Sequence, residues 1–166
     1  MRPLSYSILL LFLIMSCKEN KIQESYKTGQ EGKQIPDFSI QLVDGVTYIN
    51  TNNIAPGNDF LLFYYNPQCP FCRAQMRDIL NNIEDFKNKK ILMLTNGSLN
   101  GMKQFINYFE LERYPNIITV RDTGSIVIKK YNVGGVPFTG HFNTTRELVS
   151  AYEGRVNVNT LKHMVN

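Results

Sequence analysis

Residues 60–73 read FLLFYYNPQCPFCR, an apolar run followed by two cysteines that stand three positions apart. The run over 60–65 is apolar or aromatic throughout, which is typical of a central strand covered on both faces. Pro70 comes directly after Cys69, and a helix tolerates proline at its first position because no N–H partner is needed there. The sequence therefore predicts a strand, a short loop and a helix with Cys69 at its N-terminal end. At that end the partial positive charge of the helix favours a thiolate over a thiol.

The rest of the chain beyond residue 34 predicts a single α/β domain. Apolar residues recur at helical spacing after the cysteines and predict a helix that ends near Asn88 and Lys89. Further segments follow in this order: a strand at 91–95, a helix around 102–109, a strand at 117–120, a helix or a strand at 126–131, a hairpin at 138–142 and 148–152, and a closing helix at 158–165. Upstream, residues 38–42 and 46–49 flank an Asp44-Gly45 turn and predict an N-terminal hairpin. This order implies a mixed central sheet flanked by helices.

The N-terminal residues predict export. Arg2 precedes an apolar run over 8–15, and eight apolar residues are too few for a spanning helix, which needs roughly 20. Ser16 and Cys17 then complete a sequence that resembles a bacterial lipobox, in which the cysteine is acylated and becomes the mature N-terminus. The alternative is an ordinary secretory signal in which Cys17 is incidental.

Three parts of the chain follow from this interpretation: a signal peptide at 1–16, a lipid-anchored flexible tether at 17–33, and a folded domain at 34–166. The tether is assigned because this segment is polar and has little to bury. The formal net charge of +4 is small and evenly spread, so it gives no support for nucleic-acid binding. The expected location is the bacterial cell envelope, outside the cytoplasm and attached to a membrane through Cys17.

Three features together carry a resemblance to a known family. They are the Cys69 to Cys72 pair at a strand–helix junction, the sequence GGVPF at 134–138, and the sequence YEG at 152–154 before the last helix. The chain resembles the thioredoxin-like superfamily, and within it the TlpA/ResA-type extracytoplasmic thiol–disulfide oxidoreductases. The resemblance covers about 34–166. It implies a thioredoxin fold with an N-terminal β-hairpin and a central helix–strand insertion between Cys72 and Pro137.

The resemblance also implies roles for individual residues. Cys69 would attack a disulfide, and the more buried Cys72 would resolve the mixed disulfide. Pro137 would be a cis proline, so that Val136 offers backbone groups to an extended substrate. Pro70 and Phe71, between the cysteines, would adjust the redox poise and contact the substrate. The implied partners are exported proteins with thiols or disulfides and an upstream redox partner that recharges the pair, and no metal or organic cofactor is required.

Two positions depart from the pattern of the family. Phe63 stands where thioredoxins carry a buried Asp, and Gln75 stands where the ResA-like branch carries a Glu. The sequence therefore names no acid that takes the proton of Cys72.

Other readings remain open. A peroxiredoxin-like peroxidase shares the fold, but Asn66 stands where its motif needs Thr or Ser, and Leu62 stands where that motif has proline. A copper-handling module would use the thiols with His141, although copper chaperones of the Sco type have three residues between their cysteines. We expect His141 and His163 on the surface or in loops. A non-catalytic binding module with a static disulfide is the third alternative, and a four-residue ring gives such a disulfide little stabilising value.

Overall fold

The computed structural model describes residues 23–54 and 59–165. The expected signal peptide at 1–16 and the expected lipid attachment site Cys17 lie outside these residues.

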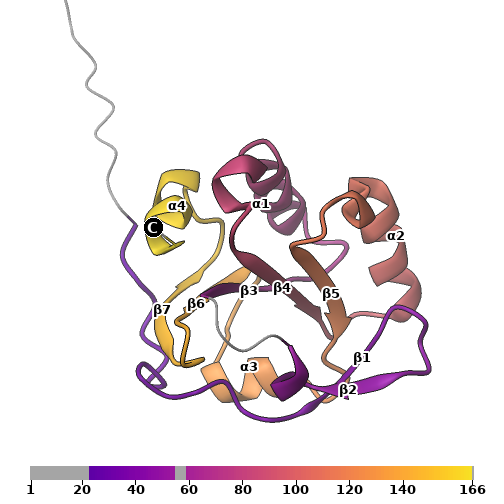
Figure 1. The fold of residues 1–166 in the computed structure, drawn as a ribbon, viewed down its shortest axis with the longest axis horizontal. Coiled ribbons are helices and arrows are strands. Elements are labelled where there is room, and N and C mark those ends of the chain that lie inside the picture. The colour runs from indigo at the N-terminus through magenta and orange to yellow at the C-terminus, as the bar shows by residue number, and fades with distance from the viewer. Residues whose placement is uncertain (1–22, 55–58, 166) are drawn as a thin grey trace, which may run out of the picture.

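A seven-stranded sheet forms the centre of the molecule (Figure 1). Its strands are β1 (Ser39–Gln41), β2 (Tyr48–Asn50), β3 (Phe60–Tyr64), β4 (Lys90–Thr95), β5 (Ile117–Arg121), β6 (Phe138–Phe142) and β7 (Leu148–Glu153). The α-helices are α1 (Pro70–Leu80), α2 (Leu99–Phe109), α3 (Ile126–Tyr131) and α4 (Val158–Val165).

The sheet is mixed, and its strand order is β2-β1-β5-β4-β3-β6-β7. Strands β3, β4 and β5 are parallel, whereas β6, β7 and the β1–β2 hairpin pair antiparallel with their neighbours. The stretch between Cys72 and Pro137 holds two strands and two α-helices in addition to the rest of α1. This arrangement confirms the predicted thioredoxin fold, with its N-terminal hairpin and its inserted helix and strand.

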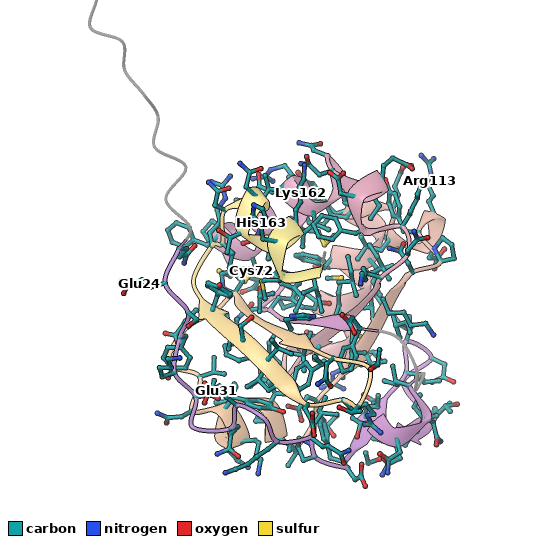
Figure 2. The ribbon with its side chains drawn as sticks, turned by 60° about the vertical axis from the view of Figure 1, so that its left-hand side comes forward. Glu24, Glu31, Cys72, Arg113, Lys162 and His163 are labelled. Atoms are coloured by element: carbon teal, nitrogen blue, oxygen red, sulfur yellow. The ribbon has the colours of Figure 1, made fainter. Side chains whose placement is uncertain are left out.

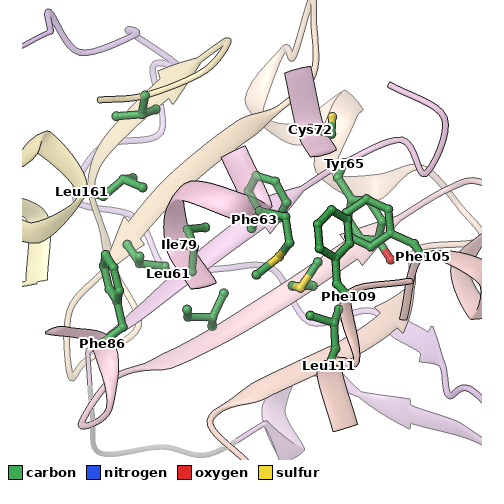
Figure 3. Close-up of a cluster of buried hydrophobic side chains, with 14 of the residues drawn as sticks. Leu61, Phe63, Tyr65, Cys72, Ile79, Phe86, Phe105, Phe109, Leu111 and Leu161 are labelled. Atoms are coloured by element: carbon green, nitrogen blue, oxygen red, sulfur yellow. The ribbon is translucent and has the colours of Figure 1, made fainter. Parts of the chain in front are cut away.

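Central strand β3 carries apolar side chains on both faces, as the sequence predicts. Because side chains alternate along a strand, Leu61, Phe63 and Tyr65 point to one side of the sheet and pack with α1, α2 and α4. Figure 3 shows Phe63 and Tyr65 among side chains of α1 and α2 in this cluster. The opposite face of β3 packs with α3 and with residues of the N-terminal segment. Helices α1, α2 and α4 thus cover one face of the sheet and α3 covers the other (Figure 1).

Two elements differ from, or go beyond, the sequence prediction. Helix α1 ends at Leu80, before the expected end near Asn88, and a 3-10 turn follows over Ile83–Phe86. The side chain of Asn82 donates to the carbonyl of Asp78 and so occupies an acceptor that a longer helix would use. The ambiguous segment at 126–131 is helix α3.

Helix α3 forms because a buried carboxylate caps it. Asp122 accepts hydrogen bonds from the backbone N–H groups of Ile126 and Val127, both at 2.9 Å. The first N–H groups of a helix have no partner within the helix, so these contacts favour a helix over a strand despite the β-branched residues.

The N-terminal segment lies along the outer edge of β7. The N–H of Tyr26 donates to the carbonyl of Ala151 at 2.6 Å, and the N–H of Leu148 donates to Lys33 at 3.0 Å. Figure 2 shows Glu24 and Glu31 on this segment beside β7. The described part of the expected flexible tether is therefore held against the domain, because the unpaired groups of an edge strand bind an extended chain.

Within residues 23–54 and 59–165, no helix has both the length and the apolar content needed to cross a bilayer.

Candidate redox site

Cys69 is the N-cap of α1, directly after the loop that leaves β3. Its sulfur accepts a hydrogen bond from the backbone N–H of Cys72 at 3.4 Å. Pro70 occupies the first turn of the helix, where its missing N–H leaves no gap in the hydrogen-bond pattern. Cys69 is partly exposed and Cys72 is buried, and both are free thiols. The helix end therefore directs an N–H donor at the more accessible sulfur.

The loop before β6 closes the other side of this sulfur. The Val136-Pro137 peptide bond is cis, as expected for this loop. The thiol of Cys69 donates to the carbonyl of Val136 at 3.5 Å. The structure thus brings together Cys69, Cys72, Val136 and Pro137, which are separated by up to 68 positions in the sequence. A peptide that reaches Cys69 meets the backbone of this loop.

Residues at the end of β7 form hydrogen bonds with the same loop, and these contacts were not predicted from the sequence. A carboxylate oxygen of Glu153 accepts the N–H of Gly134 at 3.0 Å. A Cβ added at Gly135 would lie 3.1 Å from the other carboxylate oxygen, so a side chain there would require the carboxylate to shift slightly. The N–H of Gly154 also donates to the carbonyl of Pro137 at 2.8 Å. The sequence singled out both GGVPF at 134–138 and YEG at 152–154, but it gave no sign that the two segments contact each other.

Cys72 lies in the apolar core beneath the helix end. Burial, and to a smaller degree the neighbouring sulfur of Cys69, raise the pKa of the Cys72 thiol far above its usual range. Phe63 is buried in the same cluster and offers no polar atom. The resolving thiol is therefore neutral at physiological pH.

Gln75 is fully buried on the same helix and is bound to the loop before α4. Its side-chain N–H donates to the carbonyl of Val156 at 3.1 Å, and its side-chain oxygen accepts the N–H of Val156. Both ends of the amide are thus occupied by backbone groups. A neutral amide fits this pair of contacts because it carries both a donor group and an acceptor group, so Gln75 has a structural task.

Two aromatic residues near the helix end are exposed. The side chain of Phe71 is 65% exposed, and that of Tyr108 on α2 is 62% exposed. Arg73 belongs to α1, and its side chain reaches α2, where its guanidinium carbon is 4.9 Å from the ring centre of Tyr108. The surface around Cys69 therefore offers apolar area and one cation to a docking partner.

The histidine positions weigh against a metal site at the cysteines. His141 is buried within β6 and pairs with Leu61 at the start of β3, whereas Cys69 follows the end of that strand. The expectation of a surface or loop position was therefore wrong for His141, because β6 is covered on both faces. Burial lowers the pKa of His141, against the opposing effect of Asp59 nearby. His163 lies exposed on α4 (Figure 2).

Among the described residues, no group of three or more His, Cys, Asp or Glu side chains is placed to hold a metal ion.

The chain matches one protein family and one curated relative. The profile of the AhpC/TSA family matches residues 31–156. The methylamine utilization protein MauD of Methylophilus methylotrophus is 22% identical over 107 residues, which is 64% of this chain and 48% of MauD. The chain thus spans about half the length of this curated relative.

Solved structures share the fold at low sequence identity. A secreted Mycobacterium tuberculosis disulfide oxidoreductase, homologous to E. coli DsbE, has a TM-score of 0.62 at 17% identity, over 77% of this chain and 93% of that one. The peroxidoxin BcpB of the same organism has a TM-score of 0.65 at 13% identity, over 82% of this chain and 94% of that one. These likenesses show the fold.

Proposed function

The chain belongs to the AhpC/TSA family, and from this membership we propose that it is a thiol–disulfide oxidoreductase acting on protein thiols through Cys69 and Cys72. The observation that carries the proposal is the position of Cys69. This sulfur lies between the N-terminal end of α1 and the cis-proline loop, within 3.5 Å of the Val136 carbonyl. An accessible sulfur beside a helix N–H is placed to act as a nucleophile.

The proposed exchange has two steps. The Cys69 thiolate attacks one sulfur of a substrate disulfide, which forms a mixed disulfide and releases the other substrate sulfur as a thiolate. Cys72 then loses its proton and attacks Cys69, which forms the Cys69–Cys72 disulfide and releases the second substrate thiolate. Two electrons pass from the pair to the substrate. The same steps in reverse oxidise a substrate dithiol, and a partner protein with a dithiol or a disulfide restores the pair.

Substrate docking in this proposal uses the backbone beside the reacting sulfur. The carbonyl of Val136, directly before Pro137, lies beside Cys69, so an extended peptide can pair with this loop while its own sulfur approaches. Exposed Phe71 adds apolar contact area next to the cysteines. No metal or organic cofactor enters these steps.

A trapping comparison tests the proposal. A Cys72→Ser variant should accumulate mixed disulfides between Cys69 and its clients, identified by mass spectrometry after purification under non-reducing conditions. A Cys69→Ser variant is the matched control and should trap none, because the remaining thiol is buried. Equal trapping by both variants would reverse the two roles, and no trapping by either would contradict the proposed activity.

Export and lipid attachment at Cys17 are part of the same proposal. The sequence before Cys17 supports them, and one of the similar structures is of a secreted protein. The clients would then be proteins of the bacterial cell envelope. A Cys17→Ala variant should lose labelling by a fatty-acid analogue and leave the membrane fraction, and retained labelling would contradict the anchor.

Peroxidase activity is a second candidate, since the family match and the likeness to a peroxidoxin favour it. The loop before Cys69 argues against peroxidase activity, because Asn66 stands where the peroxiredoxin motif needs Thr or Ser. Asn66 uses its side-chain oxygen to accept the N–H of Gln68 at 2.9 Å and its carbonyl to accept the N–H of Cys69 at 3.0 Å. Hydrogen peroxide should therefore be consumed no faster by the reduced protein than by a free thiol, measured in a coupled assay.

A further inference from the structure

Arg73 is held in a fixed position beside the candidate redox site. Its side-chain Nε–H donates to the carbonyl of Pro67 at 3.1 Å, in the loop that leads to Cys69. Its guanidinium carbon lies 4.9 Å from the ring centre of Tyr108 and 5.8 Å from that of Phe105. Stacking on aromatic rings and one hydrogen bond together restrict the guanidinium plane. The side chain therefore folds back over the loop instead of extending into solvent.

The guanidinium keeps binding capacity in this position. Nε accounts for one of its five N–H donors, and the two terminal nitrogens carry the other four. Among residues 23–54 and 59–165, no carboxylate lies within ion-pair distance of Arg73. In this part of the chain, the ion pairs made by arginines join Arg113 with Glu110 and Arg155 with Asp78. Arg73 is partly exposed, so these donors can be reached from solvent.

The surroundings of Arg73 favour a negatively charged partner. The first turn of α1 contains no acidic residue, and the N-terminal end of the helix adds partial positive charge. A carboxylate that meets an immobilised guanidinium forms two hydrogen bonds with little further loss of side-chain entropy. Tyr108, which supports the guanidinium, is itself exposed and offers apolar area at the same place.

We propose that Arg73, supported by Tyr108 and Pro67, binds an acidic side chain in the client segment next to the reacting sulfur. The inference rests on the proposed function, and it adds a substrate class: disulfides with Asp or Glu close to the attacked cysteine. Arg73 then acts as a specificity-determining residue.

Three synthetic peptides with one internal disulfide provide the test. They differ only at the residues that flank the first cysteine, which are Glu, Gln or Lys. Excess dithiothreitol regenerates the reduced protein after each turnover, and kcat/KM is followed by chromatography of the reduced peptide after the rate without protein is subtracted. We expect kcat/KM to be highest for the Glu peptide, lower for the Gln peptide and lowest for the Lys peptide. The preference for Glu over Gln should be about threefold to fivefold. Because salt screens exposed charges, the preference should shrink between about 0.05 M and about 1 M NaCl.

Two variants separate recognition from a general effect of charge. Arg73→Gln should bring the Glu-to-Gln ratio of kcat/KM close to one. Any change in the reactivity of Cys69 affects all peptides alike and cancels in this ratio. Arg77→Gln removes the same charge from the exposed side of α1 one turn further on and should keep the preference.

Three outcomes would overturn the inference: no preference in the unmodified protein, an unchanged ratio in Arg73→Gln, or an equal loss in Arg77→Gln. A failure of all three peptides to react would overturn the proposed function, and the inference with it. Equal reaction with all three peptides would leave the proposed function intact and remove only the role of Arg73.

Discussion

The two sulfurs differ in their access to water, although the cysteines are only three residues apart. Cys69 is partly exposed and contacts two polar backbone groups, whereas Cys72 is enclosed by apolar side chains. A charge loses solvation when it is buried, so the thiolate of Cys72 is the costly species. Neither Phe63 nor Gln75 can take the proton of Cys72 as a carboxylate would. The side chain of Gln75 is, in addition, hydrogen-bonded at both ends of its amide. The deprotonation of Cys72 therefore controls the second step of the proposed exchange.

This difference predicts a strong pH dependence of the resolving step. Because burial raises the pKa of Cys72, the thiolate fraction stays far below saturation at neutral pH. The rate should therefore increase about tenfold per pH unit from about pH 6 to about pH 9. An aromatic disulfide that releases a coloured thiol in each step allows both rates to be measured by stopped-flow absorbance. Cys72→Ser should show the first phase alone, and a second phase that does not change with pH would contradict the prediction.

At the scale of elements, strand β7 supports the loop that faces Cys69. Glu153 at its end binds the N–H of Gly134, and Gly154 binds the carbonyl of Pro137. These contacts hold the loop at the backbone of Gly134 and of Pro137. The position of the Val136 carbonyl therefore depends on a strand that contributes no reacting atom.

Removal of the Glu153 carboxylate should loosen substrate docking. Glu153→Ala leaves the N–H of Gly134 without this partner, and we expect KM for a peptide disulfide to rise about threefold to tenfold with a smaller change in kcat. Glu153→Gln keeps an oxygen that can accept the same N–H and should restore KM. Steady-state kinetics of the three proteins, with excess dithiothreitol to regenerate the reduced pair, check this. The same KM in Glu153→Ala and the unmodified protein would show that β7 does not position the loop.

The N-terminal segment, residues 23–34, covers one edge of the sheet. It pairs with the outer edge of β7 through backbone hydrogen bonds from Tyr26 to Ala151, from Gly32 to Leu148 and from Leu148 to Lys33. The ring of Tyr26 also packs edge-on against Phe138 at 6.4 Å between ring centres. An uncovered edge strand would present the same groups to another chain.

A truncation tests the contribution of this segment. A protein that starts at residue 35 should be less stable than one that starts at residue 23 by about 2–4 kcal/mol, since it loses three backbone hydrogen bonds and the packing of Tyr26. Urea unfolding measures the difference. Size-exclusion chromatography should also show association of the shorter protein through β7. Equal unfolding midpoints and two monomeric proteins would mean that the segment lies on β7 without stabilising it.

Features that depend on neighbouring residues are predictable from the amino-acid order. The apolar run at 60–65, Pro70 after Cys69 and the alternation in the last two strands each carry a local signal, and each element lies where that signal places it. The cis peptide at Pro137 was also expected, because the loop sequence GGVPF resembles a known pattern. Such features follow from backbone geometry and from the periodicity of apolar side chains.

Contacts between residues far apart in the chain became known from the fold. Gln75 and Val156 are 81 positions apart, and no periodic pattern connects them. The same holds for Glu153 beside the glycine pair, for Arg73 on Tyr108, and for residues 23–34 along β7. The polar composition of that segment predicts a free tether, yet an unpaired strand edge binds it. The physical reason is that these contacts depend on the order of strands in the sheet, which brings together side chains that have no relation in the sequence.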